Sequence, residues 1–485
     1  MSRPASLTSV LDRAAMIGWY RRNRERSRAI FDLLADEAYY SQPIALRHPI
    51  GFYEGHLPAF SFNTLVKRGL GRPGIDPTLE SLFARGIDPA EAVGPVEPVE
   101  PVEIVASRNL PGAQARAGWP SRSAVRAFAA EADRQVLDAL ACGDIEQPGH
   151  PLLDRGEAVF SILEHEAMHQ ETLLYMWHRL PGDQKTRPSA YAPRVAGPVP
   201  SPEWIRIPAG RATLGVDRES IAFGWDNELP AYAVDVPAFD IDRHDVTNAR
   251  FLEFVDAGGY RDPRWWRPED WRWIETERIA HPLFWEREDD PTAPGAPPSG
   301  VLARGVPLAP DAGARWCWRG MFERVPLPLS WPVYVSQVEA AAFARWHDAR
   351  LPTEAEFQRA SHGSAALSIT RSRDGHAGAG EALGVFDFSS WDPEPAGSHP
   401  AGASAWGVED LIGNGWEWTS TPFAPFPGFH AMASYPEYSA DFFDGEHVVL
   451  KGASPATARE LVRPTFRNWF RARYPYVYAT FRCVR

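Results

Sequence analysis

The sequence predicts an α+β protein in which an N-terminal four-helix bundle precedes a larger, irregular and β-rich domain. Apolar residues recur at helical spacing through much of residues 1–180, with charged residues between them. Residues 181–202 are rich in Pro, Ala and Arg without any periodicity, which indicates a linker. Residues 203–485 contain many Gly and Pro residues, few helical runs and most of the 19 tryptophans. These three observations set the domain boundaries.

Four helical segments are expected before the linker. Pro43 and Pro49 separate the first two segments, and Ser121 or Ser123 can cap the third. Four such helices suit an up-and-down bundle, which often holds a metal ion between facing helices. Two short helices are expected in the second domain, where Pro352 and Thr353 supply a start signal. The expected ranges are about 7–38, 52–67, 121–140, 153–180, 338–347 and 354–360. A spacer of three Pro-Val-Glu repeats is expected at residues 95–103.

The composition favours a small-molecule enzyme. The chain has 63 acidic residues against 50 Lys and Arg, which argues against a surface that binds nucleic acid. Cys142, Cys317 and Cys483 are far apart and odd in number, so we expect a reducing compartment and a cytoplasmic protein. No stretch approaches the roughly 20 apolar residues that span a bilayer, and we expect no membrane insertion. The sequence leaves the oligomeric state open.

A metal site is indicated by His165 and His169, which lie four residues apart and therefore share one helix face. With Glu166 between them they match the His-Glu-x-x-His pattern of zinc proteases, in which the Glu is the general base. The flanking sequence differs from those enzymes, because Thr172 and Tyr175 occupy the positions of the commonest Gly and His extension. The third ligand must therefore come from another segment.

His56 is the best remote candidate for that ligand, in a segment of apolar residues. Three neutral imidazoles leave other coordination positions open, which suits a non-haem iron that binds dioxygen and substrate. A structural zinc is more often closed off by Cys. We therefore expect an iron site on His56, His165 and His169.

The second domain resembles a known family. Its landmarks match, in order, those of the formylglycine-generating-enzyme fold, a variant of the C-type-lectin fold. The matching segments are Ile207-Pro208-Ala209-Gly210, Asp245-Val246-Thr247-Asn248, Arg350-Leu351-Pro352-Thr353-Glu354-Ala355-Glu356 and Gly413-Asn414-Gly415-Trp416-Glu417-Trp418. The enzyme that names this fold needs two C-terminal cysteines for copper. Cys483 matches one of them, but Tyr478 occupies the other position, so the copper chemistry is disfavoured.

Together with a DinB-like bundle bearing three histidines, this domain resembles the iron-dependent sulfoxide synthases of ergothioneine biosynthesis. The resemblance implies that Fe(II) on His56, His165 and His169 binds O2 and joins a chalcogen donor to hercynine, the trimethylated betaine of histidine. It also implies that both domains face one active site. The positions that match the substrate motif of the family are Asn468 and Trp469. An indole beside a quaternary ammonium gains cation-π attraction.

Two loop tyrosines, Tyr435 and Tyr438, are candidate catalytic proton donors, because the family uses a tyrosine in that region. Arg122 and Arg126 could contact the donor, although helical arginines are commonly solvated.

Two departures from the ergothioneine enzymes bear on the donor. Phe470 replaces a typically acidic residue that helps to bind the amino group of a cysteine-type donor, and Met168 replaces a Gln that contacts the betaine. An ammonium buried against an apolar ring would lack a partner, at a cost of several kcal/mol. An uncharged selenosugar or thiosugar fits better, so the chain most resembles the selenoneine-synthase branch of the family.

Other functions stay open at this point. Within the family these are a hercynine sulfoxide synthase that uses γ-glutamylcysteine or cysteine, and a 5-histidylcysteine sulfoxide synthase. A zinc hydrolase would use Glu166 as its base and work without oxygen. A non-catalytic ligand-binding protein would keep its partner when the three histidines are replaced.

Overall fold

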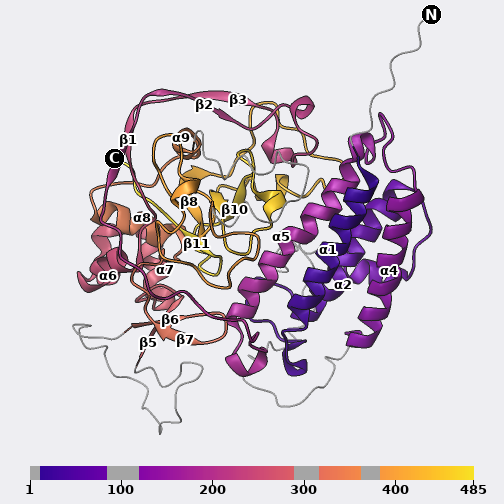
Figure 1. Cartoon of the computed structure of the whole chain (residues 1–485), viewed down its shortest axis with the longest axis horizontal. Coiled ribbons are helices and arrows are strands. Elements are labelled where there is room, and N and C mark those ends of the chain that lie inside the picture. Colours follow the sequence, from indigo (N-terminus) through magenta and orange to yellow (C-terminus); the bar gives the residue numbers. More distant parts are fainter. Residues whose placement is uncertain (1–10, 85–118, 289–315, 362–382) are drawn as a thin grey trace, which may run out of the picture. The chain divides into compact units, whose positions relative to one another are not determined.

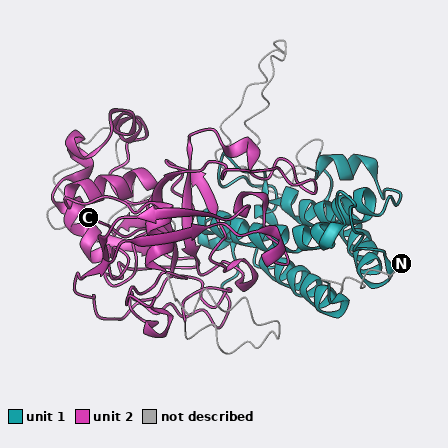
Figure 2. Ribbon diagram, turned by 90° about the horizontal axis from the view of Figure 1, so that it is seen from above, with its two compact units in different colours: residues 1–187 teal, residues 188–485 magenta. Residues whose placement is uncertain are grey.

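The computed structural model describes residues 11–84, 119–288, 316–361 and 383–485, and the expected Pro-Val-Glu spacer lies outside these ranges. The chain forms two compact units, residues 1–187 and 188–485 (Figure 2). Unit 1 is helical and unit 2 combines short strands with short helices (Figure 1). The expected α+β fold class is therefore confirmed. Within the described ranges, no helix combines the length and the apolar character that a bilayer crossing requires.

Unit 1 is built on the long helices expected from the apolar periodicity. α1 packs on α4 and α5, and α2 packs on the same two helices. The Asp12 carboxylate caps α1 by accepting the N–H groups of Ala14 and Ala15, and the Ser121 hydroxyl caps α4 at Ala124. The helices are α1 (Arg13–Phe31), α2 (Ile50–Ser61), α3 (Pro77–Leu82), α4 (Arg122–Cys142) and α5 (Glu157–Arg179), with 3-10 turns η1 (Asp36–Ala38), η3 (Asp154–Gly156) and η4 (Gly182–Gln184).

The first two helices differ from the expected ranges. α1 ends at Phe31 and the chain turns before η1, so the expected helix to residue 38 was too long. α2 begins at Ile50 and passes at Ser61 into a π-helix, η2 (Phe62–Gly69). Apolar spacing marks a buried face but does not distinguish α from π hydrogen bonding, and π segments are often found at functional sites.

Unit 2 is organised around a four-stranded sheet with the order β10-β9-β8-β11. β11 is parallel to β8, and the other pairs are antiparallel. Three small antiparallel sheets, β1-β4, β2-β3 and β5-β6-β7, complete the strands. The strands are β1 (Trp204–Ile207), β2 (Gly210–Leu214), β3 (Tyr232–Val236), β4 (Phe239–Asp242), β5 (Trp285–Arg287), β6 (Trp316–Arg319), β7 (Arg324–Pro326), β8 (Gly415–Pro422), β9 (His447–Ala453), β10 (Asn468–Arg471) and β11 (Ala479–Thr480).

The helices of unit 2 are short. Ser336 with Glu339, and Thr353 with Glu356, form capping boxes at the starts of two helices, as the start signal at Thr353 predicted for one of them. The helices are α6 (Asn248–Asp256), α7 (Pro268–Glu277), α8 (Gln337–Trp346) and α9 (Glu354–Ala360).

A buried ion pair holds the C-terminal segment in the core of unit 2. The guanidinium of Arg482 is fully buried and binds both carboxylate oxygens of Glu417, at 2.6 and 2.8 Å. Asp245 lies 3.2 Å from the same guanidinium. Because one cation faces two carboxylates here, burial and the neighbouring charge of Glu417 raise the pKa of Asp245 well above its ordinary value.

Candidate metal centre

The structure brings the three predicted histidines together inside unit 1. His56 lies on α2, and His165 and His169 lie one turn apart on α5. Their ring centroids are 4.5 to 5.1 Å apart. One ring nitrogen from each residue lies within 4.8 Å of the other two. This spacing allows one metal ion to contact all three rings.

The protonation of these rings also fits a metal ion. The Nδ1–H of His56 donates to the carbonyl oxygen of Phe83 at 2.7 Å, which directs the Nε2 lone pair toward the other two histidines. This Nε2 and the Nδ1 of His169 are buried and have no hydrogen-bond partner among the described residues. Burial lowers the pKa of His56 to about 4, and burial first, then the neighbouring histidines, lowers the pKa values of His165 and His169 well below the ordinary value. All three are neutral at pH 7, as metal ligands must be.

Aromatic rings close one side of the centre. Phe60 stacks on the His165 ring at 3.6 Å, and Phe52 stacks on the His56 ring at 5.1 Å. His56 and His165 are accordingly buried, whereas His169 and Met168 are partly exposed. The centre therefore opens toward solvent on the side of His169 and Met168.

Glu166 points away from the three histidines. Its Oε1 accepts hydrogen bonds from Arg24 at 2.8 Å and from Ser27 at 2.6 Å, both on α1. Arg24 in turn contacts Asp133 of α4 at 2.8 Å. A hydrolytic base must reach the metal-bound water, and this carboxylate is instead used to join α5 to α1. The geometry therefore gives no support to the zinc-hydrolase alternative.

Arg122 and Arg126 form ion pairs within the bundle. Both bind the carboxylate of Glu54, at 3.4 and 3.0 Å, and Arg122 also binds Asp36 at 3.0 Å. Glu54 lies two residues before His56 on α2, about 200° around the helix, so these arginines face away from the histidines. A contact with the donor stays a prediction that would require them to leave Glu54.

In unit 2 the structure places Trp469 and Tyr438 in one aromatic cluster. The Trp469 ring stacks on Phe423 at 4.4 Å and meets the Tyr438 ring edge-on at 5.0 Å. Tyr438 is buried and stacks on Trp225 at 3.9 Å. Tyr435 is partly exposed, with its ring 5.7 Å from that of Tyr438. Tyr438 thus contacts the predicted substrate tryptophan, and Tyr435 lies beside Tyr438.

Trp225 and Phe423 were missed by the sequence reasoning. Their signal was weak, because single aromatic residues are common in a domain so rich in tryptophan. The residues after Trp225 hold the loop that carries Tyr435 and Tyr438 in place. The Ser439 hydroxyl donates to Asp226, and Asn227 donates to Ser439 at 3.0 Å. In the sequence, the polar run Asp226–Glu228 after two aromatic residues is the feature that could have indicated a contact between this segment and the loop of the two tyrosines.

Phe470 follows Trp469 on β10 and therefore faces the other side of the strand. It is partly exposed and stacks on Tyr474 at 5.5 Å with the rings nearly parallel, at 3°. Asn468 accepts the backbone N–H of Trp469 through its side-chain oxygen at 2.9 Å. The environment of Phe470 is thus aromatic.

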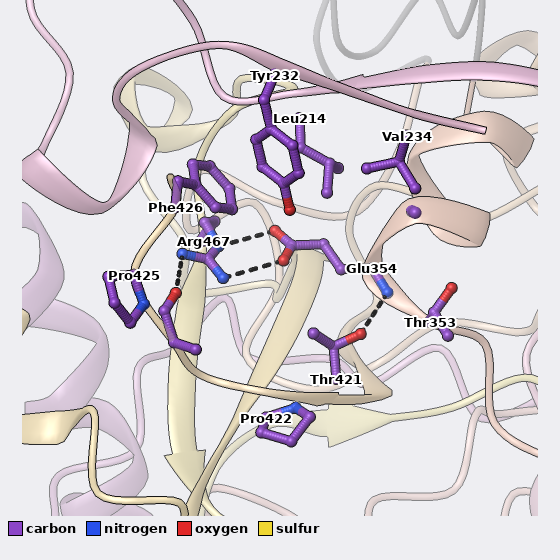
Figure 3. Close-up of a pocket in the computed structure, with 12 residues that line it drawn as sticks. Leu214, Tyr232, Val234, Thr353, Glu354, Thr421, Pro422, Pro425, Phe426 and Arg467 are labelled. Carbon is purple, nitrogen blue, oxygen red and sulfur yellow. Dashed lines mark hydrogen bonds and ion pairs between the residues drawn. The ribbon is translucent and has the colours of Figure 1, made fainter. Parts of the chain in front are cut away.

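A pocket of unit 2 lies beside the residue that precedes this strand (Figure 3). Its floor is the ion pair of Arg467 and Glu354, joined by hydrogen bonds of 2.9 and 3.1 Å. Tyr232 and Phe426 form part of its wall, and Tyr232 points toward Glu354 in Figure 3. Asn468 and Trp469 are outside its lining. The buried ion pair therefore anchors the start of β10.

Two family models match the chain, one in each unit. The Sulfatase-modifying factor enzyme 1-like domain matches residues 192–485, which is more than half of the chain. The DinB superfamily matches residues 20–173.

Curated relatives match most of the chain. A hercynine oxygenase of Mycolicibacterium smegmatis is 35% identical over 358 residues, covering 72% of this chain and 74% of that protein. One of Mycobacterium tuberculosis is 34% identical over 355 residues, with the same coverage. Ergothioneine biosynthesis protein 1 of Neurospora crassa is 26% identical over 93% of this chain and 55% of its own length. The chain therefore belongs to the hercynine oxygenase family, in which it combines a DinB-type bundle with a sulfatase-modifying-factor domain.

Proposed function

We propose that this protein is an Fe(II)- and O2-dependent enzyme that forms a carbon–sulfur or carbon–selenium bond on the imidazole of hercynine. The observation that carries the proposal is the set of three neutral imidazoles, two of them buried and one partly exposed, whose ligand nitrogens lie within 4.8 Å of one another. Three neutral ligands leave coordination positions for small molecules, as non-haem iron oxygenases require. The names of the relatives in the family supply the substrate class.

In this proposal, iron bound at the three histidines supplies the redox chemistry with dioxygen. The residues of the chain orient the ligands, exclude water and bind the substrates. His56, kept in one tautomer by the Phe83 carbonyl, presents Nε2 to the ion. Phe60 and Phe52 exclude water from one side of the centre. Substrates enter from the side of His169 and Met168.

Recognition of the betaine is assigned to Asn468 and Trp469. The cluster around Trp469 supplies aromatic faces and edges, and a quaternary ammonium gains about 0.5 to 2 kcal/mol against such a face. Tyr435 and Tyr438 are the candidate proton donors. Replacing each separately with Phe should identify the donor, because loss of the catalytic hydroxyl lowers kcat about 100-fold or more, whereas loss of a packing hydroxyl changes it little.

The chalcogen donor has two candidates. The relatives named for hercynine oxygenation and ergothioneine biosynthesis favour a thiol of that pathway, γ-glutamylcysteine or cysteine. The second candidate is a selenosugar, and the aromatic surroundings of Phe470 favour it. Phe470 is partly exposed and stacks on the buried Tyr474, and this aromatic face suits a sugar ring and offers no charge to an ammonium group.

One assay tests the function. The Fe(II)-loaded protein receives hercynine and air with a selenosugar, a thiosugar, cysteine or γ-glutamylcysteine, and oxygen uptake and product masses are measured. We expect turnover that stops without oxygen, and the donor that gives product decides between the two candidates.

The ligand assignment needs matched variants. His56→Ala, His165→Ala and His169→Ala should each lose stoichiometric metal and turnover. His430→Ala, which replaces an exposed histidine of unit 2, should keep both. Full metal content in all three ligand variants, or turnover that is equally fast under nitrogen, would refute the proposal.

A further inference from the structure

A buried polar cluster joins α1 to α5 beside two of the candidate metal ligands. The Ser27 hydroxyl of α1 donates to Oε1 of Glu166 at 2.6 Å, and it accepts a hydrogen bond from Nε2 of Gln170 at 3.0 Å. The same nitrogen of Gln170 donates to the carbonyl oxygen of Asn23 at 2.9 Å. Each of these four residues is at most 2% exposed. We call them the α1–α5 polar cluster, and Ser27 lies at its centre.

The cluster lies at the turn of α5 that carries the ligands. Glu166 directly follows His165, and Gln170 directly follows His169. Successive side chains of an α-helix are about 100° apart, so the two contact residues share one face and the two histidines share the adjacent face. Rotation or sliding of α5 on α1 would therefore break the contacts and would also move both imidazoles relative to His56 of α2.

Hydrogen bonds determine the orientation of a helix more sharply than apolar packing does. Apolar burial has no direction, whereas a hydrogen bond requires both a short distance and a suitable angle. A broken bond in this cluster would leave a buried polar group without its partner, which is unfavourable, so one rotation and one register of α5 are favoured. We propose that Ser27 and Gln170 are positioning residues, which hold α5 so that His165 and His169 point at the metal ion. This inference rests on the proposed function.

The cluster can be weakened while other contacts keep α1 on α5. The Nδ2 of Asn23 donates to the carbonyl oxygen of Leu163 at 2.8 Å, and the indole N–H of Trp177 donates to the carbonyl oxygen of Ile30 at 3.0 Å. Neither bond involves the Ser27 hydroxyl. A variant without that hydroxyl should therefore still fold.

The experiment measures metal binding by the full-length protein without substrate. Co(II) serves as the probe, because its visible absorption bands depend on the number and arrangement of its ligands. Ser27→Ala and Gln170→Met should each bind Co(II) about 10-fold more weakly than the wild type, as is typical when a residue that orients a metal ligand is lost. Their absorption bands should also shift. Far-UV circular dichroism at the same temperature checks that the helices of each variant are intact.

Arg13→Met is the matched control. Arg13 donates hydrogen bonds from the start of α1 to the carbonyl oxygens of Leu140 at 2.8 Å and Gly143 at 2.7 Å, about 20 Å along the helix from Ser27. This variant should be less stable than the wild type but should keep its Co(II) affinity and absorption bands. Wild-type Co(II) binding in both cluster variants, or equally weakened binding in Arg13→Met, overturns the inference. A wild type that binds no Co(II) overturns the metal centre of the proposed function itself.

Discussion

The three site histidines owe their neutrality to burial. His56, His165 and His169 each have burial as the largest cause of a lowered pKa, and the neighbouring rings add to it. Burial of a cationic imidazole among Phe52, Phe60 and other apolar side chains is costly, whereas the neutral ring is a ready metal ligand. The apolar side chains that form the bundle core therefore also keep the ligand imidazoles neutral.

Burial acts in the same direction on Lys451, and this gives a prediction for pH. Its ammonium donates to the carbonyl oxygens of Pro464 and Phe466, and burial lowers its pKa to about 8. An unfolded lysine has a pKa near 10.4, so between these values the unfolded chain binds more protons. The free energy of unfolding should therefore rise with pH from about 8 to about 10.4 through this group, by about 3 kcal/mol.

The measurement is urea unfolding at several pH values in that window. Other groups also titrate there, so the informative quantity is the difference between the wild type and Lys451→Met. The variant should lack the rise that the wild type shows. Parallel curves for the two proteins would mean that Lys451 keeps an ordinary pKa in the folded protein.

The parts of the site that were predictable share a simple origin. The spacing of His165 and His169 places two rings on one helix face whatever the rest of the fold does. Glu166, one residue on, has a side chain about 100° around the helix, and its partner Arg24 is 142 residues away in sequence. Trp225 likewise reaches Tyr438 only through the fold. Long-range partners such as these are absent from local sequence patterns.

At the scale of the element, α2 combines a metal ligand with a close helix contact. Gly55 precedes His56, and a Cβ atom at this position would lie 2.5 Å from the ring of Phe83, which is fully buried. The carbonyl of the same Phe83 holds His56 in its tautomer. The glycine therefore serves both packing and ligand orientation.

We expect Gly55→Ala to destabilise the protein by about 1 to 3 kcal/mol, because the Phe83 ring must move in a packed core. The Phe83 carbonyl would move with it, and metal affinity should fall about 10-fold. Thermal unfolding and a metal titration measure the two effects.

Gly18→Ala is the matched control. This glycine is in α1, and its added Cβ would make only an ordinary contact of 3.5 Å with Arg22. Alanine is the better helix former by up to about 1 kcal/mol, so this variant should be as stable as the wild type or more so, with unchanged metal affinity. If Gly55→Ala and Gly18→Ala had equal stability and equal metal affinity, Phe83 would not have the role in packing and ligand orientation described above.

The helices also show how far local sequence patterns predict secondary structure. Apolar spacing predicted the long helices of unit 1 and the starts of α8 and α9, because capping and periodicity are local. It extended the first helix too far, since Leu33 and Leu34 continue the apolar spacing although the helix ends at Phe31. The π-helix after Ser61 has no local signal of its own.

At the scale of the whole molecule, the two units should respond differently to metal. The candidate ligands all belong to unit 1, residues 1–187. A ligand that binds only the folded state stabilises it by about 2.7 kcal/mol at 100 times its dissociation constant. In scanning calorimetry of the full chain, the transition of unit 1 should therefore rise by several degrees when Fe(II) is added anaerobically.

The His165→Ala protein supplies the comparison. Its unit 1 transition should stay at the same temperature with and without Fe(II), because one of three ligands is gone. The transition of unit 2 should not move in either protein. A shift confined to unit 2 would place the ion outside the bundle.

The three imidazoles carry no negative charge, and this has a practical consequence for which ion the protein contains after purification. Nitrogen ligands of this kind hold zinc more tightly than ferrous iron in the ordinary order of divalent ions. Cells grown in zinc-rich medium should therefore yield a mis-metallated, inactive preparation. Chelation followed by reconstitution with Fe(II) under reducing conditions should restore oxygen uptake. Stripped protein that is reconstituted with zinc should show no oxygen uptake.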